Sequence, residues 1–134
     1  MDSSRPTPTL KKVLCIEDEH FIGELYARAL EKAGYDVDIE MDGQKGLTAA
    51  QTDEYDIILL DLMVPSITGM EILSALRDPA QTPELHARII ITTNLEQRDD
   101  VRENIESQAD GYIVKASITP YELADFLGNL EPTQ

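Results

Sequence analysis

Short apolar runs alternate five times with longer amphipathic stretches along most of this chain. The runs predict strands at 12–16, 35–40, 56–60, 88–92 and 112–114. Several of these runs are apolar nearly throughout, which is typical of parallel strands that are covered on both faces. The stretches after them carry apolar residues at spacings of three and four, and they predict helices at 18–33, 43–51, 69–77, 97–108 and 120–130.

This alternation predicts an α/β fold with a five-stranded parallel sheet between two layers of helices. Right-handed crossovers restrict it to a doubly wound, flavodoxin-like arrangement with strand order 2-1-3-4-5. We expect residues 11–130 to form this one domain, residues 1–10 to be a polar, disordered leader, and residues 131–134 to be a short tail. Ligands of such sheets bind at the carboxyl ends of the strands.

The predicted helices differ in the strength of their signals. Thr68 followed by Glu71 is the pattern of a capping box, and it marks the start of the third helix. The fourth helix, 97–108, is polar, with Val101 and Ile105 as its main apolar anchors. Because it buries little apolar surface, we expect this helix to be the mobile part of the domain.

Composition narrows the classes of protein that fit. Eleven basic and 26 acidic residues leave a net charge of −15, and direct binding of nucleic acid would need Lys and Arg to neutralise phosphates. No apolar run approaches the roughly 20 residues of a membrane-spanning helix, and residues 1–10 lack the apolar core of a signal peptide. Cys15 has no second cysteine to pair with and is expected to be a small apolar residue in a buried strand. We therefore predict a cytoplasmic protein that neither binds nucleic acid directly nor inserts into a membrane.

Chemically related side chains follow four of the predicted strands. Glu17 and Asp18 follow the first strand, and Asp61 follows the third. Thr93 follows the fourth strand, and Lys115 follows the fifth. The carboxyl ends of parallel strands meet at one edge of the sheet, so these five groups are expected to converge. Clustered carboxylates repel one another unless a cation neutralises them, and hard oxygen ligands favour Mg²⁺.

A divalent ion beside Asp61 would suit phosphoryl transfer. It would shield the phosphoryl oxygens from the carboxylates and hold the donor in line with the attacking oxygen. Lys115 would pair with the anionic product, and the Thr93 hydroxyl would donate to a phosphoryl oxygen. Asp61 is therefore predicted to be a nucleophile that forms an acyl phosphate.

These residues belong to longer motifs. The motifs are Glu17-Asp18-Glu19, Asp61-x-Met63-x-Pro65-x-x-x-Gly69, Thr93 placed 22 residues before Lys115, and Gly111-Tyr-Ile-Val-Lys115. With them, the sequence resembles the response-regulator receiver family over about residues 11–130. The resemblance implies that Asp61 is the phosphoacceptor and that Lys115 pairs with the phosphate. It also implies that Asp18, Asp61 and the backbone carbonyl of Met63 bind Mg²⁺ directly, and that Glu17 reaches the ion through water.

A conformational switch made of Thr93 and Tyr112 is a further implication of the resemblance. Thr92 and Thr93 point to opposite faces of a strand, so only one of them reaches Asp61, and the spacing to Lys115 favours Thr93. The predicted fourth helix, fifth strand and fifth helix would then form a face that binds a downstream protein or a second copy of the chain. The phosphoryl donor would be a sensor histidine kinase or a histidine phosphotransfer protein.

Two other uses of the same fold are left open: a phosphotransfer shuttle in a relay, and a binding module that acts without phosphorylation. Two other classes fit less well. A haloacid-dehalogenase-type phosphatase needs a second Asp where Met63 stands, and a flavodoxin needs a phosphate-binding loop where Glu17-Asp-Glu-His20 repels anions. We therefore expect a phosphoacceptor that catalyses its own phosphorylation, not an enzyme that acts on a separate substrate.

The sequence departs from the family in ways that carry their own predictions. Ala116 stands where the family usually has a proline after the lysine, and a cis bond before a non-proline residue costs about 3 kcal/mol, so we expect a trans bond and a different loop. Met63 and Leu95 stand where the family's side chains flank the hydrolytic water, and neither can orient a water, so we expect slow self-dephosphorylation. His20 and His86 are isolated and are expected to be surface residues.

Overall fold

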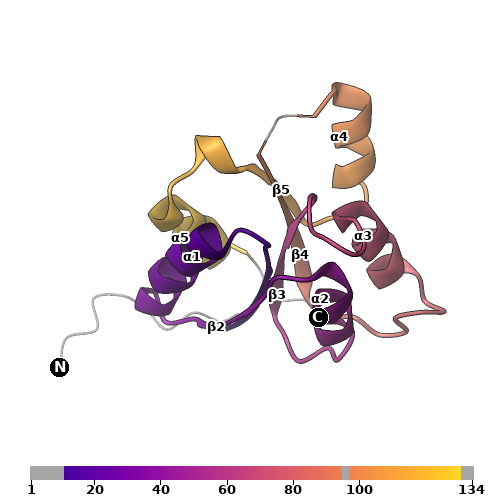
Figure 1. Ribbon diagram of the computed structural model, residues 1–134, viewed down its shortest axis with the longest axis horizontal. Coiled ribbons are helices and arrows are strands. Elements are labelled where there is room, and N and C mark those ends of the chain that lie inside the picture. The colour runs from indigo at the N-terminus through magenta and orange to yellow at the C-terminus, as the bar shows by residue number, and fades with distance from the viewer. Residues whose placement is uncertain (1–10, 95–96, 131–134) are drawn as a thin grey trace.

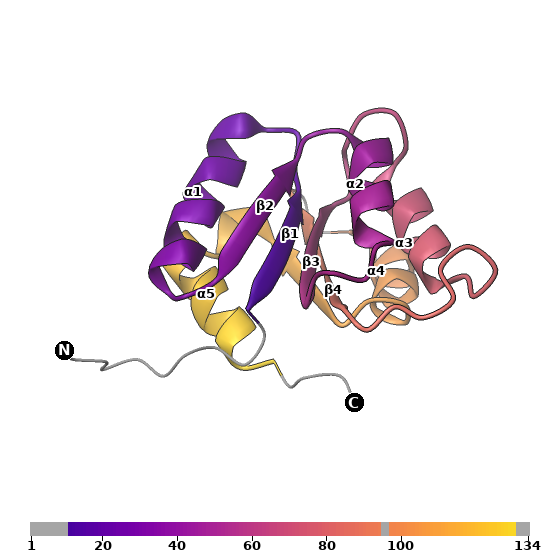
Figure 2. The same ribbon diagram turned by 90° about the horizontal axis from the view of Figure 1, so that it is seen from below.

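A parallel sheet forms the centre of the computed structural model, which describes residues 11–94 and 97–130. Its strand order is β2-β1-β3-β4-β5, as predicted, and Figure 2 shows neighbouring strands side by side. The strands are β1 Lys12–Ile16, β2 Asp36–Glu40, β3 Ile57–Asp61, β4 Arg88–Thr93 and β5 Gly111–Val114. The flavodoxin-like α/β fold is confirmed. The predicted leader (1–10) and tail (131–134) lie outside the described residues.

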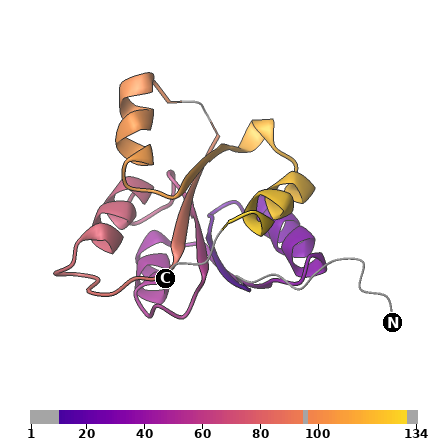
Figure 3. The same ribbon diagram turned by 180° about the vertical axis from the view of Figure 1, so that it is seen from behind.

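Helices cover both faces of this sheet. They are α1 His20–Lys32, α2 Gly43–Ala50, α3 Gly69–Arg77, α4 Asp99–Glu106 and α5 Pro120–Gly128, with a short 3₁₀ turn, η1, at Lys115–Ser117. Helices α1 and α5 lie together on one side, and α2, α3 and α4 lie on the other (Figures 1 and 3). In the described residues no helix is long and apolar enough to cross a membrane.

Alternate residues of the strands supply two separate apolar clusters. Leu14 and Ile16 of β1 pack with residues of α2, α3 and α4, whereas Val13 and Cys15 pack with residues of α1 and α5. This alternation is the two-residue period of a strand with both faces covered. Cys15 is only 1% exposed, so its predicted place in a buried strand is confirmed. Burial raises the pKa of its thiol to about 12, which keeps the sulfur protonated and unreactive.

Local signals explain most helix boundaries. The predicted capping box is present: the Thr68 hydroxyl accepts a hydrogen bond from the Glu71 backbone N–H, and the Glu71 carboxylate accepts one from the Thr68 N–H. Thr119 and Glu122 form a second capping box at the start of α5, which was not predicted. Helix α4 is shorter than predicted, and its N-cap residue, Arg98, makes no side-chain capping bond. The helix was predicted too long at both ends, because its apolar residues are few and no capping side chain marks its start.

Strand register brings the carboxyl ends of four strands to one edge. Residue Ile16 of β1 pairs with Leu60, and Asp61 pairs with Thr92 of β4. Asp61 is therefore the last residue of β3 and not, as expected, the first residue after it. No peptide bond in the described residues is cis, so the bond after Lys115 is trans, as expected. The chain there turns into η1 before it reaches α5.

Candidate functional site

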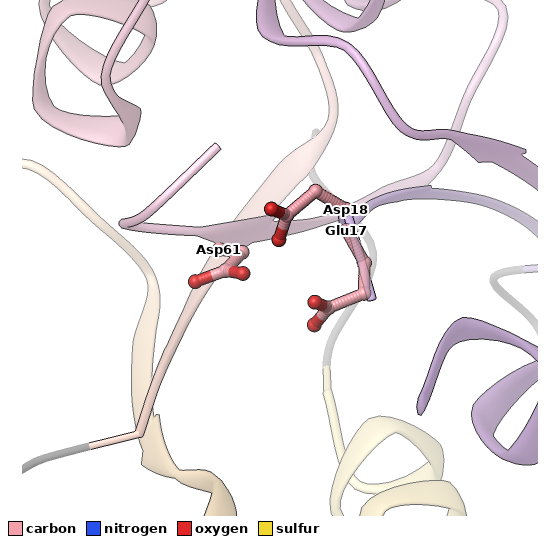
Figure 4. A group of neighbouring side chains, drawn as sticks. All are labelled: Glu17, Asp18 and Asp61. Carbon is pink, nitrogen blue, oxygen red and sulfur yellow. The ribbon is translucent and has the colours of Figure 1, made fainter. Parts of the chain in front are cut away.

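Three carboxylates gather at the carboxyl edge of the sheet. Each of Glu17, Asp18 and Asp61 offers one oxygen, and these oxygens all lie within 4.8 Å of one another. Figure 4 shows the carboxylates turned toward a common space between the β1 and β3 ends. Glu17 is 1% exposed and Asp61 is 2% exposed, whereas Asp18 lies at the surface. The cluster can therefore receive a metal ion from solvent on the side of Asp18, in keeping with the predicted Mg²⁺ site.

A buried lysine lies against two of these carboxylates. The Nζ atom of Lys115 lies 2.5 Å from Oε1 of Glu17 and 3.1 Å from Oδ2 of Asp61. The Lys115 side chain is only 7% exposed. A charge pair that is so well shielded from water interacts strongly, because little solvent screens it. The chain thus brings together four residues that the sequence predicted to converge, from the ends of β1, β3 and β5.

Burial and pairing act in opposite directions on the titration of this group. Burial is the largest effect on Glu17 and raises its pKa to about 7; the Asp61 charge adds to the rise, while the Lys115 hydrogen bond opposes it. Burial alone would lower the pKa of Lys115, but the bond to Glu17 and the charge of Asp61 outweigh it, and the pKa is raised. Lys115 therefore stays charged. With Glu17 close to half-protonated at neutral pH, Asp18, Asp61 and the remaining charge on Glu17 still exceed the single cation, so the site is net negative and favours a divalent ion.

Backbone N–H groups orient the two buried carboxylates. Met63 N donates to Oδ1 of Asp61 at 3.0 Å, and Glu19 N donates to Oε2 of Glu17 at 3.1 Å. Asp18 does not cap α1, because the N-cap residue of that helix is Glu19, whose side chain makes no capping bond. The Asp18 carboxylate is therefore left to other roles. The Met63 side chain is 72% exposed beside Asp61.

The two candidate threonines end β4 on opposite faces of the sheet. Thr92 pairs with Asp61 in register, and Thr93 follows it; both are buried. Ile91 and Tyr112 both pack in the cluster beneath α2, α3 and α4. By the two-residue period of a strand, Thr93 lies on the same face as Ile91, and Thr92 lies on the other. This arrangement agrees with a Thr93–Tyr112 pair, although the choice of Thr93 stays a prediction.

Tyr112 makes contacts with α4 and its approach that the sequence did not reveal. Its hydroxyl accepts a hydrogen bond from Gln97 N at 3.2 Å. The Arg102 guanidinium lies 4.6 Å from the centre of the Tyr112 ring, within cation–π range. No spacing in the sequence signals these contacts, because they depend on how α4 lies against β5. Leu95, the other residue predicted to affect hydrolysis, lies outside the described residues.

The two histidines are at the surface, as expected. His20 is the exposed first residue of α1. His86 is also exposed, but its ring Nδ1 lies 2.6 Å from Oδ2 of Asp53. Neither histidine belongs to the carboxylate cluster.

Comparison with known proteins agrees with this geometry. The model of the response regulator receiver domain matches residues 13–127. Over 121 residues the chain is 40% identical to the response regulator ArlR of Staphylococcus saprophyticus, and the match covers 90% of this chain and 51% of that protein. The chain thus spans about half the length of the curated relatives it matches.

Solved structures lead to the same family. The chemotaxis response regulator CheY4 of Vibrio cholerae is 30% identical, with a TM-score of 0.75 over 89% of this chain and 97% of that one. The BeF₃-activated N-terminal receiver domain of RstA from Klebsiella pneumoniae is 28% identical, with a TM-score of 0.73 over 87% of this chain and 95% of that one. The chain belongs to the response regulator receiver domains of two-component signalling.

Proposed function

We propose that this chain accepts a phosphoryl group on Asp61, with Mg²⁺, from a histidine kinase or a histidine phosphotransfer protein. Response regulators as a family are phosphorylated by histidine kinases and act on downstream targets. The observation that carries the proposal is the meeting of Asp61 with Glu17, Asp18 and Lys115 at one edge of the sheet. This combination supplies a nucleophile, oxygen ligands and a cation for an anionic product.

The residues present fit the metal that the family binds. Asp18, Asp61 and the Met63 carbonyl would hold Mg²⁺, and Glu17, which is already paired with Lys115, would reach it through water. When bound, the ion supplies positive charge that screens the phosphoryl oxygens from the carboxylates. It also requires near-octahedral geometry, so the placement of each ligand matters.

The chain's own groups account for the transfer. A carboxylate oxygen of Asp61 attacks phosphorus and forms the acyl phosphate, while the bond from phosphorus to the donor's imidazole nitrogen breaks. The electron pair of that bond stays on the imidazole nitrogen. Lys115, 3.1 Å from Asp61 before transfer, is placed to pair with the new phosphoryl oxygens. The Thr93 hydroxyl at the end of β4 would donate a hydrogen bond to one of them.

The output would be a change in the face formed by α4, β5 and α5. Movement of Thr93 toward the phosphoryl group would free space beneath α4, where Tyr112 packs. A shift of Tyr112 would break its bond to Gln97 N and its contact with Arg102. The altered face would then bind a downstream protein or a second copy of the chain.

Substitution of Asp61 tests the proposal. We expect Asp61→Asn to abolish hydroxylamine-sensitive labelling by acetyl phosphate or a kinase, because an amide is a poor nucleophile toward phosphorus. Asp18→Ala should weaken Mg²⁺ binding and labelling together, and EDTA should prevent labelling of the wild type. Asp36→Asn, at an exposed position on the edge strand β2, is the matched control. Labelling of Asp61→Asn at the wild-type level, or full labelling in EDTA, would contradict the proposal.

A further inference from the structure

The loop after Asp61 is closed tightly at its base. Leu62 N donates to Thr92 O at 3.1 Å, and Gly69 N donates to Leu62 O at 3.0 Å. A Cβ atom on Gly69 would lie 2.5 Å from both the Asp61 carbonyl oxygen and the Leu62 Cα, so the two ends of the loop approach as closely as backbone allows. Met63 lies within this loop, one residue beyond its base.

The tip of the same loop is hydrogen-bonded to the start of α2. Gly43 N donates to Pro65 O at 3.0 Å, and Gln44 N donates to the Ser66 hydroxyl oxygen at 3.1 Å. The first N–H groups of a helix have no partner within it, and here the loop supplies partners for two of them. A Cβ atom on Gly43 would lie 2.6 Å from Ile67 O and 2.8 Å from Pro65 O. Both contacts are with backbone, which cannot move aside as the end of a side chain can.

Ser66 adopts a conformation that its contacts have to maintain. Its φ of 72° lies in the left-handed region, which is uncommon for residues other than glycine. The Ser66 side chain lies beside Asp42, the N-cap residue of α2, and helps to lower the pKa of that carboxyl after the larger effect of the bond from Lys45 N. Ser66 thus joins the loop to the helix through the hydrogen bond that its hydroxyl accepts from Gln44 N. Strained backbone of this kind persists where surrounding structure holds it, and it is common near functional sites.

We propose that the N-terminus of α2, through Gly43 and Ser66, positions the loop that carries the Met63 carbonyl for Mg²⁺ binding. The inference rests on the proposed function, in which that carbonyl is a metal ligand. The direction of a backbone carbonyl is set by the backbone on either side of it. The Met63 peptide lies between the closed base of the loop and its tip, which is hydrogen-bonded to α2. Because Mg²⁺ tolerates little departure from octahedral geometry, releasing the tip weakens metal binding. Gly43 and Ser66 are positioning residues and touch neither metal nor phosphate.

Titration with Mg²⁺ in the absence of any phosphoryl donor tests this directly. We expect Ser66→Ala and Gly43→Ala each to raise the Mg²⁺ dissociation constant about tenfold, the lower end of the effect of losing a partner behind a metal ligand. Calorimetry or the amide chemical shift of Met63 follows the binding. Labelling by acetyl phosphate should slow at limiting Mg²⁺ and return to the wild-type rate at saturating Mg²⁺, since Asp61 and Lys115 are untouched.

The opposite end of α2 offers a matched control. The Thr52 hydroxyl donates to Ala49 O at 2.7 Å and accepts from Glu54 N at 3.3 Å. Thr52→Ala therefore removes a hydroxyl with two backbone bonds just beyond the end of the same helix without touching the loop, and it should leave Mg²⁺ affinity unchanged. Ser66→Gly removes the hydroxyl but suits the positive φ. It should weaken Mg²⁺ binding like Ser66→Ala, because the lost hydrogen bond with Gln44 N, and not the strain, is responsible.

Failures of the two proposals can be told apart. If wild type binds Mg²⁺ and is labelled on Asp61, while Ser66→Ala and Gly43→Ala bind Mg²⁺ equally well, the positioning role is wrong and the proposed function stands. A labelling defect that persists at saturating Mg²⁺ also overturns the positioning role. If Gly43→Ala does not fold, the two Ser66 variants decide the question. A wild type that neither binds Mg²⁺ nor becomes labelled on Asp61 overturns the proposed function itself.

Discussion

Each carboxylate oxygen of Asp61 accepts a hydrogen bond from a different part of the chain. Oδ1 accepts from Met63 N, two residues along the loop, and Oδ2 accepts from Lys115 at the end of β5. The Met63 backbone thus holds the carboxylate, while its side chain is 72% exposed. A thioether can neither donate a hydrogen bond nor hold a water in a fixed direction. Water that attacks a phosphoryl group on Asp61 therefore finds no partner in this side chain.

We predict that Met63→Asn shortens the lifetime of the acyl phosphate. The amide can hydrogen-bond a water near the phosphoryl group, and a roughly fivefold faster hydrolysis corresponds to about 1 kcal/mol of barrier. The measurement is a chase after labelling and removal of the donor. Met41→Asn, at an exposed methionine just after β2, is the control and should decay like wild type. Equal decay of Met63→Asn and wild type would show that this position does not set the lifetime.

Single residues at the site were predictable where topology alone decides their place. Strand ends in a parallel sheet meet at one edge, and so Glu17, Asp61 and Lys115 could be placed together from the sequence. The direct pairing of Lys115 with Glu17 at 2.5 Å could not, because it depends on side-chain burial and strand register. The contacts between the start of α2, at Gly43, and the loop after β3, at Ser66, were also missed, because neither residue belongs to a recognisable motif.

At the scale of elements, the two ends of α4 make contacts with different parts of the fold. Beyond its C-terminus, Arg77 of α3 donates to Gln108 O at 2.6 Å and pairs with Asp110 at 3.1 Å. Asp110 also accepts from Ile89 N at 2.8 Å. Of the two apolar anchors named from the sequence, Ile105 is fully buried and Val101 is only partly buried. At the start of the helix, Tyr112 accepts a hydrogen bond from Gln97 N and its ring lies against Arg102, so the two ends of α4 are held by different kinds of contact.

We predict that amide exchange in α4 is graded along its length and responds to a beryllofluoride mimic. Amides near Val101 and Arg102 should exchange faster than those of Gln108 and Ala109, because Val101 is only partly buried whereas Ile105 is fully buried, so opening at the start of the helix exposes less apolar surface. Beryllofluoride should change protection mainly at the start of the helix, where Arg102 contacts Tyr112. Exchange measured by NMR with and without the mimic provides the check. Slow exchange throughout α4 that the mimic leaves unchanged would argue against a mobile switch.

Two loops at the opposite edge of the sheet from the site are joined by His86 and Asp53. His86 N donates to Oδ1 of Asp53 at 2.8 Å, in addition to the ring contact with Oδ2. The hydrogen bond with Asp53, and then its charge, raise the pKa of His86. Burial alone would raise the pKa of Asp53, but the bonds from His86 outweigh it and the pKa is lowered. The pair is therefore charged on both sides at slightly acid pH.

We predict that this link stabilises the domain more at pH 5.5 than at pH 8.5. Since folding raises the pKa of His86, its contribution is complete below the unfolded value of about 6.5 and is lost as pH rises through the folded value. Asp53 stays ionised across this range. Because the pair is exposed, the Tm of His86→Gln should fall only about 1–2 °C below wild type at the lower pH, and less at the higher pH. His20→Gln is the control for an exposed imidazole, and a deficit independent of pH would contradict the ion pair.

The element boundaries show where local signals were sufficient. The apolar run that became β3 and the capping box before α3 placed both elements almost correctly, because each signal is strong and local. Helix α4 was predicted too long, since Arg98 makes no side-chain capping bond at its start and its apolar positions are few.

At the scale of the whole molecule the strand order was predictable, because alternating strands and helices with one crossover hand leave few topologies. The occupant of the α4–β5–α5 face was not, since nothing in the pattern of one chain identifies it.

Charge is the whole-molecule property that bears most directly on this face. Exposed acidic residues gather on its two helices: Asp99, Asp100, Glu103, Glu106, Glu122 and Asp125. Arg98 and Arg102 are the basic residues at the start of and within α4, and each pairs with a carboxylate of its own region. The net charge of the chain is −15. Two copies that meet through this face would bring like charges together, whereas a basic partner would be attracted.

We therefore predict that self-association of the activated domain increases with salt. With beryllofluoride at low ionic strength, repulsion between the acidic helices should keep the chain monomeric. At about 0.5 M salt the Debye length falls to roughly 4 Å, and any dimer that forms through the face should become more populated. Sedimentation velocity at low and high salt measures this. Reversal of charge at Glu103, by Glu103→Lys, should reduce the dependence on salt, while Asp36→Lys on the distant edge strand should change the net charge equally without that effect. A dimer that is strongest at low salt would mean that opposite charges on the two copies meet. The face would then suit a second copy of the chain and not a basic partner.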